Sequence, residues 1–316
     1  MRRFFFGEKG DTSWNLEKLK KEVKNFYHFN IDIRNKQKIF DLFRKNEFGA
    51  IIHCAAQPSH DWARKDPHID FEVNALGTLN LLEATRRYCP SAPFIFMSTN
   101  KVYGDSPNYL PLKELKTRFD YAKKEHYHGI DETLSIDRSK HSIFGASKVA
   151  ADIMVQEYGR YFKMSTVCFR GGCLTGPQHS GVELHGFLSY LIKVAVTGQT
   201  YKVFGYKGKQ VRDQIHSYDV VSAFESFINN PRQGAVYNLG GGRENSVSIL
   251  ECFKIIKGMT KKDVRYEYKE ENREGDHICY ISNLNQFKRD YPKWKITKNK
   301  DLIFKEMINA ELAKAI

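Results

Sequence analysis

The chain has 316 residues, 41% hydrophobic and 28% charged, which is ordinary for a globular protein with a large core. No window holds the roughly 18 consecutive apolar residues that span a bilayer, and residues 1–6 are too short for the apolar region of about 7–15 residues in a signal peptide. The net charge of +13 comes from Lys and Arg dispersed among acidic residues, which favours a solvated surface and an anionic small substrate over nucleic-acid binding. We therefore expect a cytoplasmic protein with neither membrane nor nucleic acid as a partner.

The first elements along the chain predict a parallel sheet. Residues 48–56 form a short apolar run that ends in small residues, as buried strands do. A helix is predicted over 66–88, with Asp66 as its cap and Pro67 in its first turn, and a second apolar run follows at 93–97. Strand, helix and strand in this order make the crossover unit of a parallel sheet.

The same alternation continues with a helix over 144–161 and a strand over 166–169. Ligands of open α/β sheets bind at the carboxyl ends of the strands. The segments that follow the predicted strands, 55–57, 98–100 and 170–173, should therefore converge on one crevice.

The alternation weakens after residue 173, where helices over 186–196 and 218–229 and strands over 201–204 and 236–239 are predicted. The predicted fold is α/β, a Rossmann-like doubly wound parallel sheet with a smaller C-terminal α/β substrate domain. We expect the NAD-binding domain in 1–172, with a return segment at about 213–240, and a mainly substrate-binding domain in 173–316. The polar segment 113–138 is predicted to be a loop over the site.

Six cysteines are spread along the chain without a C-x-x-C pair, so neither a disulfide framework nor a zinc site is expected. No other metal site is predicted.

Three motifs carry a resemblance to a known family. They are Ser-Thr-Asn-Lys-Val-Tyr-Gly at 98–104, Phe-Gly-Ala-Ser-Lys at 144–148, and Gly-Lys-Gln-Val-Arg-Asp at 208–213. In order and interval they resemble the extended short-chain dehydrogenase/reductase superfamily, in its NAD-dependent epimerase/dehydratase family. The resemblance implies NAD as cofactor, a nucleotide sugar as substrate with a CDP-hexose favoured, and a homodimer. The implied reaction oxidises the sugar transiently to a keto-sugar and reduces it again.

The resemblance also implies roles for the catalytic positions. Thr99 matches the residue that hydrogen-bonds the reacting oxygen, and Lys148 matches the lysine that binds the nicotinamide ribose and lowers the pKa of a catalytic tyrosine. Phe144 stands at the position of that tyrosine, four residues before Lys148 and on the same helix face.

A phenyl ring cannot exchange the proton that general acid–base catalysis requires. Three interpretations of Phe144 remain open: another group substitutes, the chain is a weak enzyme, or it binds nucleotide sugars without turnover. The candidate substitutes nearest to the motifs are Tyr103, His141 and Cys173.

Cofactor recognition matches the family in part. The resemblance implies that NAD is bound by Asp32, Ile33, Ala55, Ala56, Gln57, Asn74, Ser98 and Lys148. The G-x-x-G-x-x-G loop that would cradle the pyrophosphate is absent, and glycines 240–242 follow the wrong strand to replace it. We expect the first strand and this loop, about 30 residues, to be missing because the start was placed at an internal Met.

Arg212 and Arg273 match family arginines that grip the diphosphate, a task suited to bidentate guanidinium groups. Gln57 and Asn100 are expected to contact the sugar because of their strand-end positions. Dehydratases of the family usually carry Asp-Glu directly after the catalytic threonine. Here Asn100 and Lys101 follow Thr99, and neither can act as a carboxylate. The sequence therefore favours epimerisation over dehydration.

Overall fold

The computed structural model describes residues 11–183, 185–273 and 275–314. Its first sheet is parallel throughout and has the strand order β1-β2-β5-β9. The strands are β1 (Ile51–His53), β2 (Phe94–Thr99), β5 (Thr166–Gly171) and β9 (Ala235–Leu239). At the carboxyl end of this sheet Thr99 lies opposite Gly171, which lies opposite Leu239.

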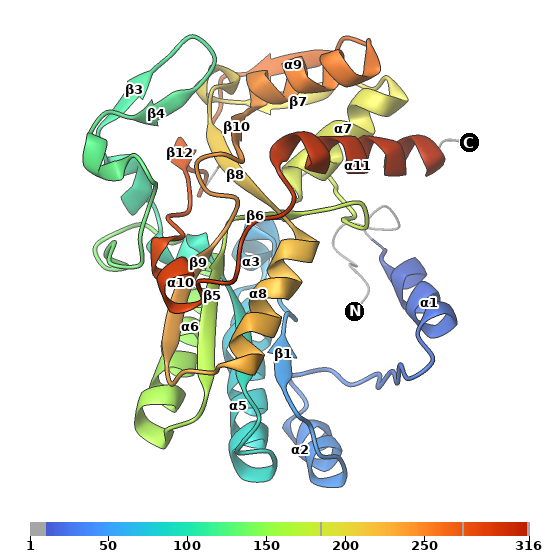
Figure 1. The fold of residues 1–316 in the computed structure, drawn as a ribbon, viewed down its shortest axis with the longest axis vertical. Coiled ribbons are helices and arrows are strands. Elements are labelled where there is room, and N and C mark those ends of the chain that lie inside the picture. Colours follow the sequence, from blue (N-terminus) through green and yellow to red (C-terminus); the bar gives the residue numbers. More distant parts are fainter. Residues whose placement is uncertain (1–10, 184, 274, 315–316) are drawn as a thin grey trace.

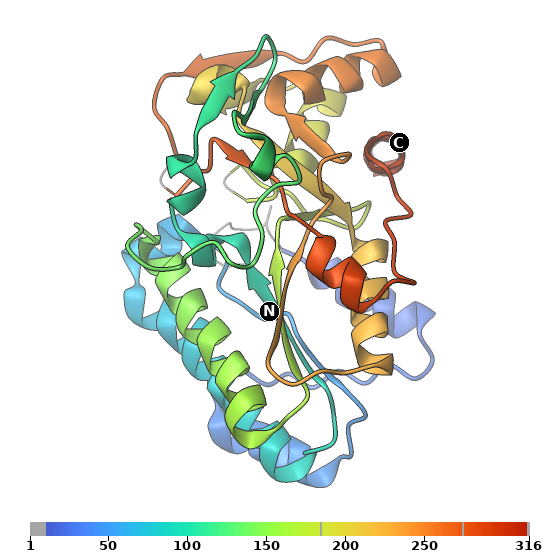
Figure 2. The ribbon, with the colours of Figure 1, turned by 60° about the vertical axis from the view of Figure 1, so that its left-hand side comes forward.

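Helices cover both faces of this sheet (Figure 2). Three of them, α2 (Lys36–Lys45), α5 (Gly77–Tyr88) and α6 (Ser142–Phe162), pack in the core of one face. The other face is covered by α8 (Ser217–Asn229) and α10 (Asn285–Asp290). Phe94 and Phe96 of β2 point into the first core, and Ile95 between them points into the second. The expected doubly wound Rossmann-like α/β fold is thus confirmed.

The predicted helix over 66–88 is found with an interruption. The side chain of Asp66 caps α4 (Pro67–Phe71) by accepting a hydrogen bond from the N–H of Ile69 at 3.0 Å. A π-helical turn at Glu72–Leu76 separates α4 from α5. Such turns often occur at functional sites, and this one carries Asn74.

Beyond the first sheet, a second sheet has the order β10-β8-β12, with β6 also paired to β8 (Figure 1). Its strands are β6 (Cys173–Thr175), β8 (Val211–His216), β10 (Ser246–Ser248) and β12 (Cys279–Tyr280). A further parallel pair joins β7 (Tyr201–Phe204) to β11 (Tyr266–Lys269). A separate apolar core holds α7 (Phe187–Thr197), α9 (Ile249–Thr260) and α11 (Lys300–Lys314). The division into two domains at residue 173 stays a prediction.

The polar segment 113–138 is more ordered than expected. Its first part belongs to an antiparallel hairpin of β3 (Leu112–Glu114) and β4 (Phe119–Tyr121), and Ile130 forms a bridge with Ser282. The prediction of a loop was therefore wrong for the hairpin, where backbone pairing organises the chain.

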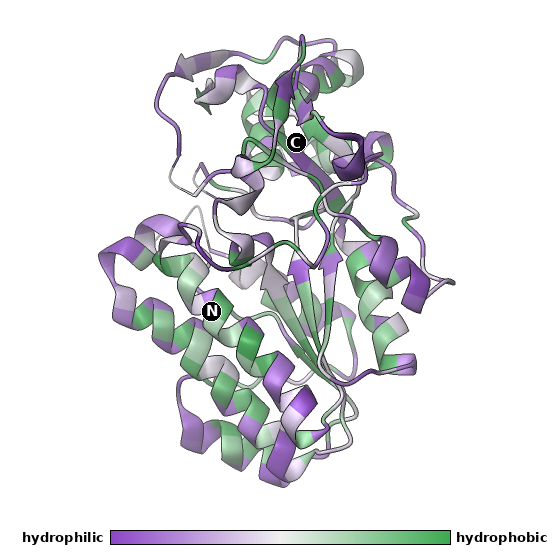
Figure 3. Ribbon diagram, turned by 90° about the vertical axis from the view of Figure 1, so that its left-hand side faces the viewer, coloured by the Kyte–Doolittle hydropathy of each residue, from purple (hydrophilic) through white to green (hydrophobic). Residues whose placement is uncertain are grey.

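Two further α-helices are α1 (Ser13–Glu22) and α3 (His60–Lys65). The helices beside the first sheet show alternating hydrophobic and hydrophilic bands in Figure 3, as expected of helices with one buried face. None of the helices in the described ranges is long and apolar enough to cross a membrane.

Candidate active site

A cavity of about 660 Å³ opens at the carboxyl ends of β2 and β5, between the first and second sheets. All three segments that were expected to converge contribute to its lining, through Ala56, residues 98–100 and residues 171–173. Ala55 is not part of the lining. The cavity therefore lies where open α/β sheets bind their ligands, at the carboxyl ends of the parallel strands.

Thr99 and Lys148 both line the cavity. The hydroxyl of Thr99, the last residue of β2, accepts a hydrogen bond from the N–H of Lys101 at 3.2 Å. Lys148 in α6 is 3% exposed, donates from Nζ to the carbonyl of Met97 at 3.0 Å, and lies 4.0 Å from the centre of the Phe96 ring. Burial lowers the pKa of Lys148 to about 8, and nearby carboxylates offset this only in part.

Phe144 lines the same cavity one helical turn before Lys148. Its ring meets the imidazole of His60 edge to face, with the ring centres 4.9 Å apart. Nδ1 of His60 lies 2.9 Å from Oγ of Ser142, and Nε2 has no hydrogen-bond partner within the described chain. An imidazole therefore lies beside the position from which the tyrosine hydroxyl is missing.

The sequence analysis missed His60. Burial lowers the pKa of His60 to about 3, and the positive charges of Lys101 and Arg273 act in the same direction. The imidazole is therefore neutral at pH 7. A signal was available, because His60 follows the predicted strand-end segment 55–57 closely in the sequence.

The three candidate substitutes for the tyrosine are placed very differently. Tyr103 is fully buried outside the cavity lining, donates to Asn238 Oδ1 at 2.8 Å and accepts from Arg170 at 3.1 Å. Burial raises its pKa to about 12. His141 also lies outside the lining, and both of its ring nitrogens are 2.8 Å from backbone carbonyl oxygens. Cys173 does line the cavity, but burial raises the pKa of its thiol to about 11.

Ser98, expected to bind NAD, uses its hydroxyl in a buried network beneath the strand ends. It donates to Asp152 Oδ2 at 2.5 Å, and Arg170 donates to Oδ1 of the same carboxylate at 2.9 Å. Gln156 adds a third hydrogen bond to Asp152 at 2.7 Å. The side chains of Asp152 and Arg170 are 1% and 5% exposed. This network joins β2, β5 and α6 where the cavity begins.

Gln57 and Asn74 fix the loop after β1 and do not line the cavity. Gln57 donates from Nε2 to Asp70 at 2.6 Å, and its backbone N–H donates to Asn74 Oδ1 at 2.9 Å. Asn74 in turn donates to Ser147 Oγ at 3.0 Å. The geometry gives both residues a role in shaping the loop, and their direct contact with ligands stays a prediction.

Asp32 and Ile33 also lie outside the cavity lining. The carboxylate of Asp32 pairs with Arg34 at 2.8 Å. Asn80 of α5 donates to the carbonyl of Ile33 at 3.0 Å, and the Ile33 side chain covers Gly77 so closely that a Cβ there would meet it at 2.6 Å. The segment is thereby fixed to the start of α5.

The opposite side of the cavity is cationic. Arg212 donates to the carboxylate of Asp276, and Lys101 donates to the carbonyl of Gly275 at 2.7 Å. Lys101, Arg212 and Arg273 all act on Asp276, so three positive charges face one carboxylate. Burial lowers the pKa of Lys101 to about 8. The predicted arginines are thus brought together, and the surplus positive charge suits a diphosphate.

Asn100, predicted to contact the sugar, is 6% exposed and lines the cavity next to Thr99.

Replacing Lys148 by methionine is expected to stabilise the unliganded protein at pH 7 by about 1–3 kcal/mol, because burying a charged lysine is costly. Lysine titrates near 10.5 when unperturbed and near 8 in the native site, so between these pH values the unfolded chain binds more protons. The contribution of Lys148 to the free energy of unfolding therefore rises from pH 8 to pH 10.5. Urea unfolding across this range should show the rise in wild type and a smaller one in the variant.

The matched control is Lys20→Met, because Lys20 is half-exposed on α1. The control should leave the pH dependence unchanged. A Lys148→Met variant with the wild-type pH dependence would contradict the depressed pKa.

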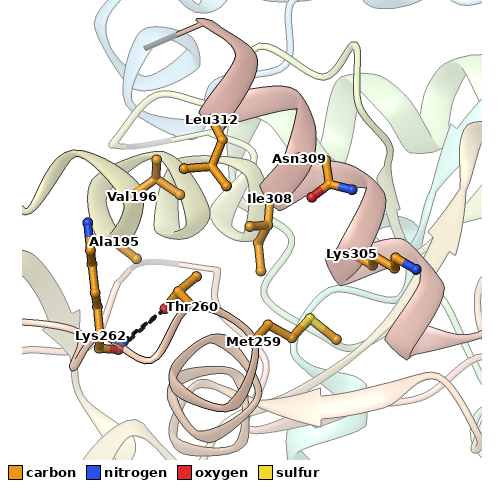
Figure 4. A pocket seen from close by; sticks show the side chains of 9 residues that line it. All are labelled: Ala195, Val196, Met259, Thr260, Lys262, Lys305, Ile308, Asn309 and Leu312. Carbon is orange, nitrogen blue, oxygen red and sulfur yellow. Dashed lines mark hydrogen bonds between the residues drawn. The ribbon is translucent and has the colours of Figure 1, made fainter. Parts of the chain in front are cut away.

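A second cavity, of about 430 Å³, lies between α7, α9 and α11 (Figure 4). Aliphatic side chains such as Val196, Ile308 and Leu312 form most of its lining, with Lys262 and Lys305 also present. It gathers no acid–base pair and lies away from the strand ends, so the first cavity is the candidate active site.

The fold and the cavity define a class of protein, a Rossmann-like α/β protein with a cavity lined by cationic side chains at the ends of its parallel strands. The chain belongs to the NAD-dependent epimerase/dehydratase family of the extended short-chain dehydrogenases/reductases. The sequence model described as "NAD dependent epimerase/dehydratase family" matches residues 7–240.

Curated relatives include both epimerases and dehydratases. CDP-paratose 2-epimerase of Salmonella typhi is 34% identical over 269 residues, which cover 83% of this chain and 78% of that protein. dTDP-glucose 4,6-dehydratase of Salmonella typhimurium is 27% identical over 289 residues, covering 88% and 74%. A solved mutant of UDP-glucuronic acid 4-epimerase from Bacillus cereus, with phenylalanine in place of one tyrosine, has a TM-score of 0.77 at 20% identity, covering 96% of this chain and 86% of its own. That structure contains NAD and a fluorinated UDP-sugar.

Proposed function

We propose that the protein is an NAD-dependent nucleotide-sugar epimerase that resembles CDP-paratose 2-epimerase in its reaction. The observation that carries this proposal is that Thr99 and Lys148 share one cavity with the cationic cluster of Lys101, Arg212 and Arg273. A sugar placed at Thr99 and Lys148 can thus have its diphosphate among these cations. The proposal includes a homodimer, as is usual in the family.

The residues present fit the nicotinamide half of NAD. The buried ammonium of Lys148 at the strand ends suits a ribose hydroxyl, and Ala56 and Thr99 line the adjoining space. When bound, the cofactor would accept and return the hydride of the sugar carbinol. For the pyrophosphate, the sequence contains no G-x-x-G-x-x-G cradle.

Within this proposal, the imidazole of His60 accepts a hydrogen bond from the sugar hydroxyl in place of the missing tyrosine, and its pKa of about 3 makes it a weak proton acceptor, as in a slow enzyme. If Nδ1–H donates to Ser142, the neutral imidazole keeps its lone pair on Nε2. Thr99 orients the same hydroxyl by a hydrogen bond. Cys173 is a poorer acceptor, because a thiol with a pKa of about 11 is protonated at neutral pH.

Epimerisation is favoured over dehydration at the same site. A dehydratase needs an acid to protonate the leaving hydroxyl and a base for the α proton. Asn100 cannot supply either proton transfer, and Lys101 already donates to the carbonyl of Gly275.

The test is to incubate the purified protein with NAD and CDP-paratose and to follow the sugar H1–H2 coupling by proton NMR. We expect conversion to the 2-epimer, and none with Lys148→Met. If calorimetry shows that both ligands bind but no epimer forms, the epimerase proposal fails.

That outcome would support the second candidate function, nucleotide-sugar binding without turnover. Phe144 favours it, because a phenyl ring cannot exchange the proton of the sugar hydroxyl. The B. cereus structure shows a related fold that holds both ligands with one tyrosine replaced by phenylalanine.

A further inference from the structure

One face of β8 presents three polar side chains in a row to the candidate active site. Gln210, which directly precedes the strand, Arg212 and Gln214 alternate along the backbone and all line the cavity. The intervening Asp213 faces the other way and accepts backbone hydrogen bonds from Gly242 at 2.9 Å and Ser282 at 3.0 Å. This wall of the cavity therefore carries an amide, a guanidinium and a second amide, in that order along the strand.

Both amides have a buried oxygen without a partner among the described residues. Gln214 is fully buried, and its Oε1 accepts no hydrogen bond from the part of the chain that the structure describes. Gln210 is 7% exposed and donates from Nε2 to the carbonyl of Phe204 at 3.0 Å, which fixes its amide orientation and leaves Oε1 unpaired. An unpaired buried acceptor is costly, so these oxygens indicate donor groups on a ligand.

The strand register gives the two amides different neighbours. Gln214 lies opposite Cys173 of β6. Cys173 closely follows Gly171 in the chain, and Gly171 lies opposite Thr99 in the first sheet. Gln214 is therefore at the end of the cavity where Thr99 lies. Gln210 is four residues away, about 14 Å along an extended strand, and contacts the end of β7 through Phe204.

Arg212 lies between the two amides, and this order matches the layout of a nucleotide sugar. Carbonyl oxygens repel phosphate oxygens, since both are acceptors, so the diphosphate belongs at Arg212. Hydroxyl and amino groups can donate to the oxygens on either side.

We propose that β8 orients a nucleoside diphosphate hexose along its length. A hydroxyl of the hexose donates to Gln214 Oε1, the diphosphate binds at Arg212, and a donor group of the nucleoside reaches Gln210 Oε1. The inference rests on the proposed function for the identity of the ligand, and it adds two specificity-determining residues and the direction in which the ligand lies.

The test is titration calorimetry in saturating NAD with CDP-glucose and with CDP. Gln214→Met should weaken CDP-glucose about 3–10-fold and leave CDP within 2-fold, as expected for one lost hydrogen bond to the sugar. Gln210→Met should weaken both ligands alike. UDP and 2′-deoxy-CDP then show whether the donor to Gln210 is the cytosine amino group or the ribose hydroxyl.

Controls guard against misfolding. Gln214→Asn keeps an amide but withdraws its oxygen by one methylene, so it should show the same selective loss. Gln233→Met, at an exposed position, should change neither affinity. Because Gln214→Met removes an unpaired buried oxygen, its Tm without ligand should equal or exceed that of wild type.

Equal losses for CDP-glucose and CDP in the Gln214 variants would overturn the proposal, as would a loss confined to CDP-glucose in Gln210→Met. Failure of wild type to bind either nucleotide would overturn it too. Binding without epimerisation would remove the proposed catalytic function only, because the β8 test reads affinity and not turnover.

Discussion

His60→Ala is expected to lower the rate of CDP-hexose epimerisation by about 10-fold, because it removes the hydrogen-bond acceptor of the reacting hydroxyl, and a group with a pKa of about 3 contributes less than a general base matched to neutral pH. The imidazole lies in edge-to-face contact with Phe144, its Nδ1 is held by Ser142, and it lines the same cavity as Thr99. The loss should appear in kcat, with little change in the affinity for CDP. NMR assays on samples quenched at fixed times measure kcat, and calorimetry on the same protein samples measures the affinity for CDP.

A second substitution separates a proton acceptor from a packing residue. Phe144→Tyr places a hydroxyl beside the space vacated in His60→Ala, so the double variant should recover part of the lost rate. Cys173→Ser is the control inside the cavity and should retain most of the activity. If His60→Ala turns over at the wild-type rate, His60 is not the acceptor.

Asp152→Ala is expected to lower the free energy of unfolding by about 3–5 kcal/mol, because it leaves the guanidinium of Arg170 buried without its carboxylate. It also removes the acceptor of the Ser98 hydroxyl at 2.5 Å and of Gln156 at 2.7 Å. Urea unfolding at pH 7 measures the loss.

Glu157→Ala is the matched control on the same helix. Its partner Arg160 lies at 2.8 Å, but both side chains are about half exposed, so the expected loss is below about 1 kcal/mol. Replacing Asp152 and Arg170 together by apolar residues should recover part of the stability, because no unpaired charge remains. Similar losses for Asp152→Ala and Glu157→Ala would contradict a buried ion pair.

Local sequence patterns predicted the elements of the first sheet well. The apolar runs at 93–97 and 166–169 became β2 and β5, and the helix expected over 144–161 is α6. Burial between two helical layers requires continuous apolar strands, and this requirement is visible in the sequence. The hairpin at β3 and β4 was missed because its pairing joins a polar segment that has no such pattern.

The site was predicted in part. Thr99, Lys148, Asn100, Arg212 and Arg273 were expected in the site and line the cavity. Ser98 lines the cavity as well, with its hydroxyl bonded to Asp152, whereas Gln57 and Asn74 lie outside the lining and form hydrogen bonds within the protein. A motif match gives the position of a residue and not the direction of its side chain, which depends on neighbours from other elements.

The sequence by itself determined the family through its motifs, and it determined the strand ends where the cavity lies and the absence of the tyrosine hydroxyl at Phe144, because these follow from residue identity and local periodicity. Only the tertiary structure decided what surrounds that gap. The contact of His60 with Phe144 and the convergence of Lys101, Arg212 and Arg273 on Asp276 join segments distant in the chain. Such contacts arise from packing the elements together, so no local pattern specifies them.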